Sequence, residues 1–234
     1  MWLIDATVDP SLSRLGSIDR DFVLLLIGWV LGIASSPITD AIRRRTVKVR
    51  LSRALRTELR SLQDTLAFVV IQLARRRGVL SRSLLEALMS TLQASGQVAS
   101  HGRALKAIEG LLEADELAQT GGALPAPPPH PLAPPALRVN GGSFLDAHFH
   151  RLDLYSVGTQ RLLVELHAGT AVYNQHVNEA MNYHLMTFDT GIGKARREAL
   201  LTAIDTCFER AAERASDLVS RIAELLQTPE MKNA

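Results

Sequence analysis

The chain has 234 residues, of which 47% are hydrophobic, 21% charged and only 5% aromatic. The high hydrophobic fraction excludes disorder over most of the length, and the low aromatic fraction disfavours a β-sandwich or β-barrel. Its single cysteine, Cys207, excludes a disulfide framework and a cysteine zinc site. The formal net charge of +2 combines −3 in residues 1–42, +9 in residues 43–77 and −4 in residues 78–234, a distribution typical of proteins that meet a membrane or a polyanion.

An acidic N-terminus precedes the first apolar segment. Residues 1–21 are expected to form a short extracytoplasmic or interfacial element with a turn at Pro10 and Ser11. Residues 22–39 carry no charge over 18 positions, and at about 1.5 Å per residue a helix of this length spans about 27 Å. A signal peptide would have basic residues before the apolar run, and here acidic ones precede it. The pattern predicts one transmembrane helix, with the buried core helix of a soluble protein as the alternative.

Basic residues follow the apolar segment directly. The ones within 15 positions of its end are Arg43, Arg44, Arg45, Lys48, Arg50 and Arg53. The positive-inside rule therefore predicts an inner-membrane protein with its N-terminus outside and its C-terminal bulk in the cytoplasm.

Small and polar residues gather in the apolar segment. They are Gly28, Gly32, Ser35, Ser36, Thr39 and Asp40. Gly28 and Gly32 form a small-xxx-small pattern that lets helices approach closely in lipid, so ordinary dimer packing is one interpretation. The other is that several copies turn these residues inward to line a narrow pore, which requires a homo-oligomer because one helix per chain encloses no path. Pro37 is expected to kink or flare the helix near its end.

Residues 40–120 are expected to form a basic stem and a helical hairpin. Leucine and valine recur at spacings of 3 or 4 from Val47 to Leu73, which predicts a long amphipathic helix. Gly78 provides a stop signal and Ser81 a start signal, and a second helix should reach Gly96 before another short one.

Three consecutive arginines, Arg75, Arg76 and Arg77, lie about 30 residues beyond the membrane-proximal ones. On an upright helix they stand about 45 Å from the bilayer, far beyond a Debye length of about 8–10 Å. One interpretation is a solvated helix C-terminus, where positive charge suits the helix dipole. The other is an anion-binding site that oligomerisation multiplies into a basic ring.

Residues 121–156 are a proline- and glycine-rich insertion and a possible ligand-binding crown. Residues 121–142 hold 7 of the 10 prolines, which favours a polyproline-like spacer or a functional loop. The segment that follows contains Asp146, His148, His150 and Asp153. Two histidines at this spacing diverge on a helix, so packing or phosphate hydrogen bonding is favoured over a metal site or catalysis. No catalytic motif occurs, and neither an enzyme nor a cofactor is predicted.

Residues 157–234 are expected to form a C-terminal helical unit. Apolar stripes predict one helix that ends near Phe188 and a last long helix over 195–226 that Pro229 ends. A polar aromatic flank precedes this last helix and comprises Tyr173, Asn174, Asn178, Asn182, Tyr183 and His184. It favours a hydrogen-bonded seam between helices, with stacking on single-stranded nucleic acid as the alternative. The predicted fold is all-α: one transmembrane helix followed by a cytoplasmic bundle.

Two stretches, GWVLGIASSPITDAIRRR and YNQHVNEAMNYHLMTFD, resemble bacterial membrane proteins of antiphage defence, and the layout is similar to the membrane effector of Hailong-type systems. The resemblance implies an oligomeric ion channel with a cytoplasmic crown. It also implies that the crown binds single-stranded DNA made by a partner nucleotidyltransferase, which keeps the channel closed. Carried over, Gly32, Ser36 and Asp40 would line the pore. The crown would then contain Arg138, His148, His150 and Arg151.

Three hypotheses follow in order of preference. The first is a homo-oligomeric, single-pass inner-membrane channel gated by an anionic cytoplasmic ligand. The second is a membrane-tethered helical scaffold that binds a protein partner and has no pore. A membrane-associated enzyme ranks last because no catalytic constellation is present.

Overall fold

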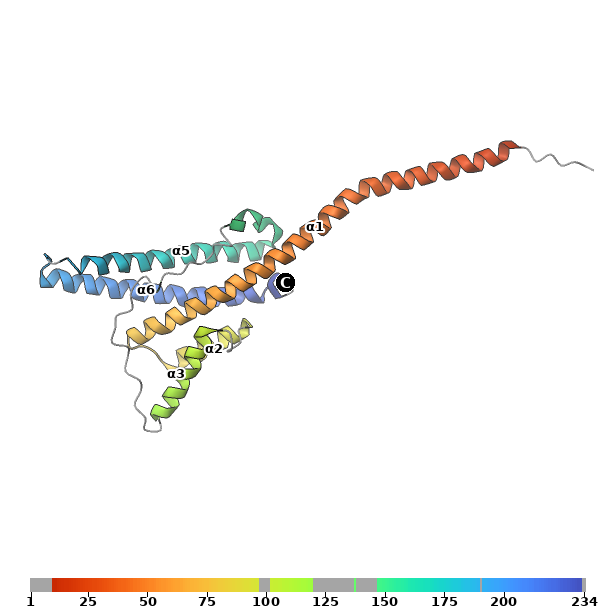
Figure 1. Cartoon of the computed structure of the whole chain (residues 1–234). Coiled ribbons are helices and arrows are strands. Elements are labelled where there is room, and N and C mark those ends of the chain that lie inside the picture. Colours follow the sequence, from red (N-terminus) through yellow and green to blue (C-terminus); the bar gives the residue numbers. More distant parts are fainter. Residues whose placement is uncertain (1–9, 97–101, 120–136, 138–146, 190, 233–234) are drawn as a thin grey trace, which may run out of the picture. The chain divides into compact units, whose positions relative to one another are not determined.

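The computed structural model describes residues 10–96, 102–119, 137, 147–189 and 191–232. Side chains are described in these ranges except at residues 10–21, 34, 36–37 and 116–119. Every element in the described ranges is a helix, which confirms the all-α prediction (Figure 1). The chain divides into two units, Met1–Val49 and Arg50–Ala234.

The longest helix, α1, runs from Pro10 to Arg76 and contributes to both units. The turn expected at Pro10 and Ser11 is wrong, because Pro10 is instead the first residue of the helix. Proline fits the first helical position, where its missing N–H would have no partner within the helix and its fixed φ suits the α conformation. The helix continues past Pro37, where a kink or flare was expected, and ends at Arg76. From Val47 to Leu73 its course is the one that the leucine spacing predicts.

Glycine and serine set the turn after α1. Gly78 has a φ of +67°, a left-handed conformation that costs glycine little and ends the helix. The Ser81 hydroxyl then accepts a hydrogen bond from the Leu84 N–H at 3.3 Å and caps the next helix. That helix, α2, spans Arg82–Ala94, and Gly96, with a φ of +74°, follows it.

The remaining helices belong to the second unit. They are α3 (Arg103–Gln119), the 3₁₀ helix η2 (Phe149–Leu154), α5 (Val157–Met186), α6 (Lys194–Gln227) and the short α7 (Pro229–Lys232). Both long C-terminal helices were predicted close to these bounds. Pro229 follows α6 as expected but begins a further turn of helix.

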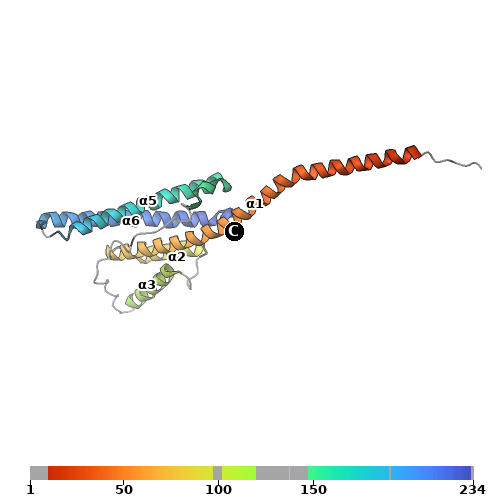
Figure 2. The ribbon, with the colours of Figure 1, turned by 45° about the horizontal axis from the view of Figure 1, so that its top comes forward.

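Three long helices run side by side in the second unit. Gln63 of α1 donates to the backbone oxygen of Val219, and Arg76 pairs with Asp205, so this part of α1 runs antiparallel to α6. α5 is antiparallel to α6 on another side, and the two helices form a hairpin (Figures 1 and 2).

One hydrophobic core fills this unit, with residues from α1, α2, α3, α5 and α6. Leu66, Leu92, Ile108, Tyr173 and Phe208 are all among its most deeply buried members. Side chains from both sides of the proline-rich insertion thus pack into the same core, and the insertion does not separate two cores.

Gly169 sets how closely α5 approaches α6. A Cβ added at this position would lie 2.7 Å from Cδ2 of Leu218, a side chain with no exposed surface. We expect Gly169→Val to lower the free energy of unfolding by about 1–3 kcal/mol, because overpacking forces the helices apart. Urea unfolding of the detergent-solubilised chain, followed by circular dichroism, measures this change. Gly110→Val is the control: a Cβ there meets nothing within 4 Å, and an equal loss in the two variants would contradict the account.

Candidate functional site

The part of α1 from Phe22 to Ile42 carries exposed apolar side chains. None of the side chains described between Phe22 and Ile42 is buried, and Leu25 is 71% exposed. Within the described residues, one helix, Phe22–Arg76, is long and apolar enough to cross a membrane by length and composition. Burying these side chains in lipid would remove a large apolar surface from water, at about 25 cal/mol per Å².

The predicted pore residues lie within this exposed stretch. A Cβ added at Gly28 or Gly32 would meet nothing within 4 Å, so both positions are open to a neighbouring helix. Ser35, Thr39 and Asp40 are exposed, whereas the Ser36 side chain lies outside the described residues. That these positions line a pore stays a prediction.

The hydroxyl of Ser35 is hydrogen-bonded within the helix. Its Oγ donates to the backbone oxygen of Gly32 at 2.8 Å, one turn earlier. A serine bonded in this way is tolerated in an apolar environment, because the polar group keeps a partner without water. The serine alone therefore does not require a pore, and the case for one depends on Thr39 and Asp40 at the end of the segment.

Two members of the arginine triplet, Arg76 and Arg77, contact α6, and Arg75 is partly buried. Arg76 pairs with Asp205 at 3.4 Å and places its guanidinium 4.5 Å from the ring centre of Phe208. Arg77 forms an ion pair with Glu209. Neither prediction for the triplet, solvated charge or anion site, anticipated these partners. An anionic ligand would have to compete with two carboxylates already held there.

The predicted crown residues lie on another part of the second unit. The rings of His148 and His150 are stacked with their centres 6.5 Å apart, and Arg151 donates to Nε2 of His150 at 3.4 Å. Phe149 packs against His167 of α5. Arg138 and Asp146 lie outside the described residues. Among the residues described, no group of three histidine, cysteine, aspartate or glutamate side chains could hold a metal ion.

The arginine triplet and the crown residues lie far apart in the second unit. Tyr155, four residues after Arg151, accepts a hydrogen bond from the Ser52 hydroxyl at 3.3 Å. Arg76 lies 24 residues further along α1, a distance of about 36 Å on a helix. The arginine triplet and the crown residues would therefore bind one ligand only if it were long, or bind separate ligands.

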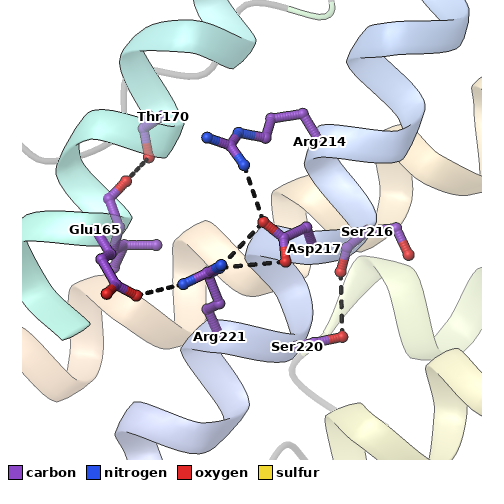
Figure 3. Close-up of polar contacts among 8 residues, drawn as sticks. Glu165, Thr170, Arg214, Ser216, Asp217, Ser220 and Arg221 are labelled. Carbon is purple, nitrogen blue, oxygen red and sulfur yellow. Dashed lines mark hydrogen bonds and ion pairs between the residues drawn. The ribbon is translucent and has the colours of Figure 1, made fainter.

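A polar network that sequence reasoning missed joins α5 to α6 (Figure 3). Arg221 contacts both carboxylate oxygens of Asp217, at 3.2 and 3.0 Å, and also pairs with Glu165 of α5. Arg214 donates to Asp217 at 3.0 Å. Carboxylates raise the pKa of Arg221, through its hydrogen bond to Asp217 first and their charges next. The spacing of 3 and 4 on α6 is visible in sequence, but charges at such positions are usual on any exposed helix face.

An open pocket of about 380 Å³ lies beside this network. Its lining residues are Val172, His176, Arg210, Glu213, Arg214 and Asp217. Two buried nitrogen atoms of the lining, Nδ1 of His176 and Nε of Arg214, have no hydrogen-bond partner among the residues that the structure describes. The lining contains both positively and negatively charged side chains, and Arg214 is already paired with Asp217. The pocket therefore favours neither an anion nor a cation.

Leu137 belongs to the hydrophobic core and is also hydrogen-bonded to α5. The Tyr173 hydroxyl donates to the backbone oxygen of Leu137, and both residues are buried. Burial raises the pKa of Tyr173, which keeps the phenol protonated and able to donate. This residue of the predicted polar flank is thus satisfied within the chain, whereas Asn178 and Asn182 are exposed, so the flank as a whole is not a seam between helices.

We expect Tyr173→Phe to lower the free energy of unfolding by about 1–3 kcal/mol, because the Leu137 carbonyl loses its donor while it stays buried. Chemical unfolding of the full chain measures the change. Tyr183→Phe is the control, since that side chain is only partly buried and should change stability by less than about 0.5 kcal/mol. A null effect at Tyr173 would show that the contact contributes nothing.

Comparisons with protein-family models, curated proteins and solved structures found no match.

Proposed function

We propose that the chain is a single-pass inner-membrane protein whose copies assemble into a homo-oligomeric ion channel, gated by an anionic cytoplasmic ligand such as single-stranded DNA, in antiphage defence. The observation that carries this proposal is the uncovered apolar stretch of α1 with small residues in its middle. Lipid would cover the apolar side chains, and Gly28 and Gly32 would let copies of the helix pack closely. A ring of copies would then place Thr39 and Asp40 at one mouth of the path.

The basic residues after the span support the orientation. Arg43, Arg44 and Arg45 are exposed directly beyond the apolar stretch, where anionic headgroups would attract each of them by about 1 kcal/mol. The N-terminus would then lie outside and the second unit in the cytoplasm.

The ligand would bind the crown rather than the arginine triplet. Arg76 and Arg77 are paired with α6 carboxylates, whereas Arg151 is exposed and donates to a ring nitrogen of His150. Arginine beside histidine offers phosphate several donors. The nucleotidyltransferase implied by the resemblance would be the source of such a ligand.

A second candidate is a membrane-tethered scaffold without a pore. The hydrogen bond of the Ser35 hydroxyl to the Gly32 carbonyl favours it, because this serine has a partner without a water-filled pore. The scaffold would need the span only for attachment.

Ion flux separates the two functions. Purified protein in liposomes loaded with a potassium-sensitive dye is compared with a chain whose residues 22–39 are replaced by an unrelated single-pass helix. A channel predicts flux from the native chain, a change of flux when a short oligodeoxynucleotide is added inside, and none from the replacement. Absence of flux from the native chain under both conditions would overturn the channel and leave the scaffold.

A further inference from the structure

The end of the α5–α6 hairpin extends past the helix that covers it. α1 ends at Arg76, which pairs with Asp205, whereas α6 begins 11 residues before Asp205, at Lys194. At about 1.5 Å per residue, about 16 Å of α6 therefore has no α1 alongside (Figures 1 and 2). We call residues 185–189 and 191–201 the hairpin tip. Its large apolar side chains, each between 49% and 68% exposed, are Leu185, Met186, Phe188 and Leu201.

The apolar stripe of α6 continues into the hairpin tip without a cover. Leu201 lies three and seven residues before the buried Ile204 and Phe208, on the same side of the helix. In the core, α1 lies on that side, where the Arg76 guanidinium contacts the Phe208 ring. Several large exposed apolar side chains in one place mark a binding surface, and this one continues an existing helix–helix interface.

Two arginines accompany these apolar side chains. Arg196 and Arg197, which we call the tip arginines, are exposed in the first turn of α6, where no acidic residue occurs. Positive charge is disfavoured at this end of a helix, because the helix dipole is positive there. Lys194 pairs with Glu198 at 3.9 Å, whereas neither tip arginine forms an ion pair with a residue that the structure describes. Negative charge from outside would offset this local cost.

A surface of the opposite charge lies on α3. Glu109 and Glu113, the α3 glutamates, are exposed, lie four residues apart, and form no ion pair with a described residue. Like charges at this spacing repel each other. A Cβ added at Gly110 would meet nothing within 4 Å, so another chain can approach closely between them. Acidic residues elsewhere in the second unit already have basic partners, among them Glu86, Glu165, Glu198, Asp205, Glu209 and Asp217.

The chain already shows how two consecutive arginines meet two such carboxylates. Arg76 pairs with Asp205 and lies over the ring of Phe208. Arg77 pairs with Glu209, four residues after Asp205. This contact is therefore an apolar residue and two carboxylates on one helix, met by two arginines at the end of another.

The sequence of α3 repeats this pattern. Residues 205–209 read DTCFE and residues 109–113 read EGLLE, so each segment has two carboxylates four positions apart with an apolar residue before the second. The tip arginines are likewise consecutive and stand at a helix end. The tip arginines and the α3 glutamates thus match a second contact of the same kind, which the described residues do not make within one chain.

Both surfaces lie toward the same end of the second unit. Oδ2 of Asp115 on α3 lies 3.9 Å from Nη1 of Arg82, the first residue of α2, which follows α1 after a short turn. The acidic part of α3 is therefore near the end of α1, beyond which the hairpin tip extends. Two different surfaces on one subunit let identical copies join head to tail and close a ring.

We propose that the hairpin tip of one copy contacts α3 of the next copy, with the tip arginines paired to the α3 glutamates. The inference rests on the proposed homo-oligomer and adds the surfaces that join its copies outside the membrane. Attachment to one membrane concentrates the copies, so a contact of modest size suffices.

Disulfide cross-linking in native membranes tests this contact. A chain with both Gly110→Cys and Leu201→Cys is expected to give a ladder of covalent dimers and larger oligomers upon oxidation, because each copy offers both halves. Either substitution alone should give at most about a tenth of the dimer, since a head-to-tail contact does not bring identical positions together. The native Cys207 is buried and is present in every variant.

Charge reversal shows whether the ion pairs stabilise the contact. Adding Arg197→Glu to the double-cysteine chain should lower the yield of the ladder about tenfold, and adding Glu113→Arg as well should restore it. Arg210→Glu reverses another exposed arginine of α6 and should leave the yield unchanged. Equal loss with Arg197→Glu and Arg210→Glu, or no recovery with Glu113→Arg, would overturn the contact.

Gly28→Cys in the span reports assembly itself. If it cross-links and the double-cysteine chain gives no ladder, the contact is wrong and the oligomer stands; if neither cross-links, both fail. A ladder that Arg197→Glu leaves unchanged, together with weaker binding of a fluorescent oligothymidylate by that variant, would overturn the proposal and assign the hairpin tip to nucleic acid.

Discussion

Replacing Gly32 with isoleucine is expected to abolish ion flux in liposomes, or lower it by about tenfold or more, while the protein stays in the membrane. A Cβ at Gly32 meets no described atom within 4 Å, so the larger side chain is not expected to disturb the single helix. It would instead hold neighbouring copies apart at the position where the small-residue pattern lets them approach. The expected loss is thus one of assembly, and cross-linking of copies should fall with the flux.

Val30→Ile is the matched control for Gly32→Ile. Val30 is exposed and two residues away, which places it on the other side of the helix. We expect flux from this variant to equal that of the native chain. Full flux from Gly32→Ile would show that the small-residue face does not pack against another copy.

Replacing Phe208 with alanine is expected to lower the free energy of unfolding by about 3–5 kcal/mol. Phe208 is 1% exposed, belongs to the core, and lies under the Arg76 guanidinium. Its removal leaves a cavity at the point where α6 meets α1. Urea unfolding of the full chain in detergent measures the loss.

Phe188→Ala controls for the loss of an aromatic ring. Phe188 is 68% exposed and follows α5, so its removal should change stability by about 0.5 kcal/mol or less. Equal effects at Phe188 and Phe208 would contradict the assignment of the core. So would unfolding of α1 at a different urea concentration from α6, because both contribute to one core.

Much of the fold follows from local patterns in the sequence. Leucine spacing predicted the course of α1 to Arg76, and Gly78 and Ser81 predicted the turn to α2. The error at Pro10 has a local cause. Proline is as suitable for the first turn of a helix as for a loop, and no acidic residue follows in the first turn to indicate a helix start.

The contacts of the arginine triplet could not be predicted from local pattern. Asp205 and Glu209 are 129 and 132 residues away from Arg76 and Arg77, and single charges at that separation have no sequence signal. The +9 of residues 43–77 suggested two anionic partners, the lipid and a ligand. The α6 carboxylates of Asp205 and Glu209 are partners for two of the distal arginines, Arg76 and Arg77, so the charge of these two does not require a ligand.

Tyr173 and the asparagines after it show the same limit. They occur together in the sequence as one polar flank, but Tyr173 faces the core and Asn178 and Asn182 face outward. Residue type alone did not tell the buried residue from the exposed ones, because tyrosine and asparagine both occur in buried networks and on surfaces. The helix period, applied to the apolar residues around them, distinguishes Tyr173 from the two asparagines.

Single-channel recording in a planar bilayer tests the central claim most directly. Purified native protein at low density is predicted to give discrete current steps, with openings that a short oligodeoxynucleotide on the side of the second unit changes in frequency. The Gly32→Ile protein, added at the same density, is predicted to give none. A silent bilayer with verified insertion of the native protein would contradict the channel.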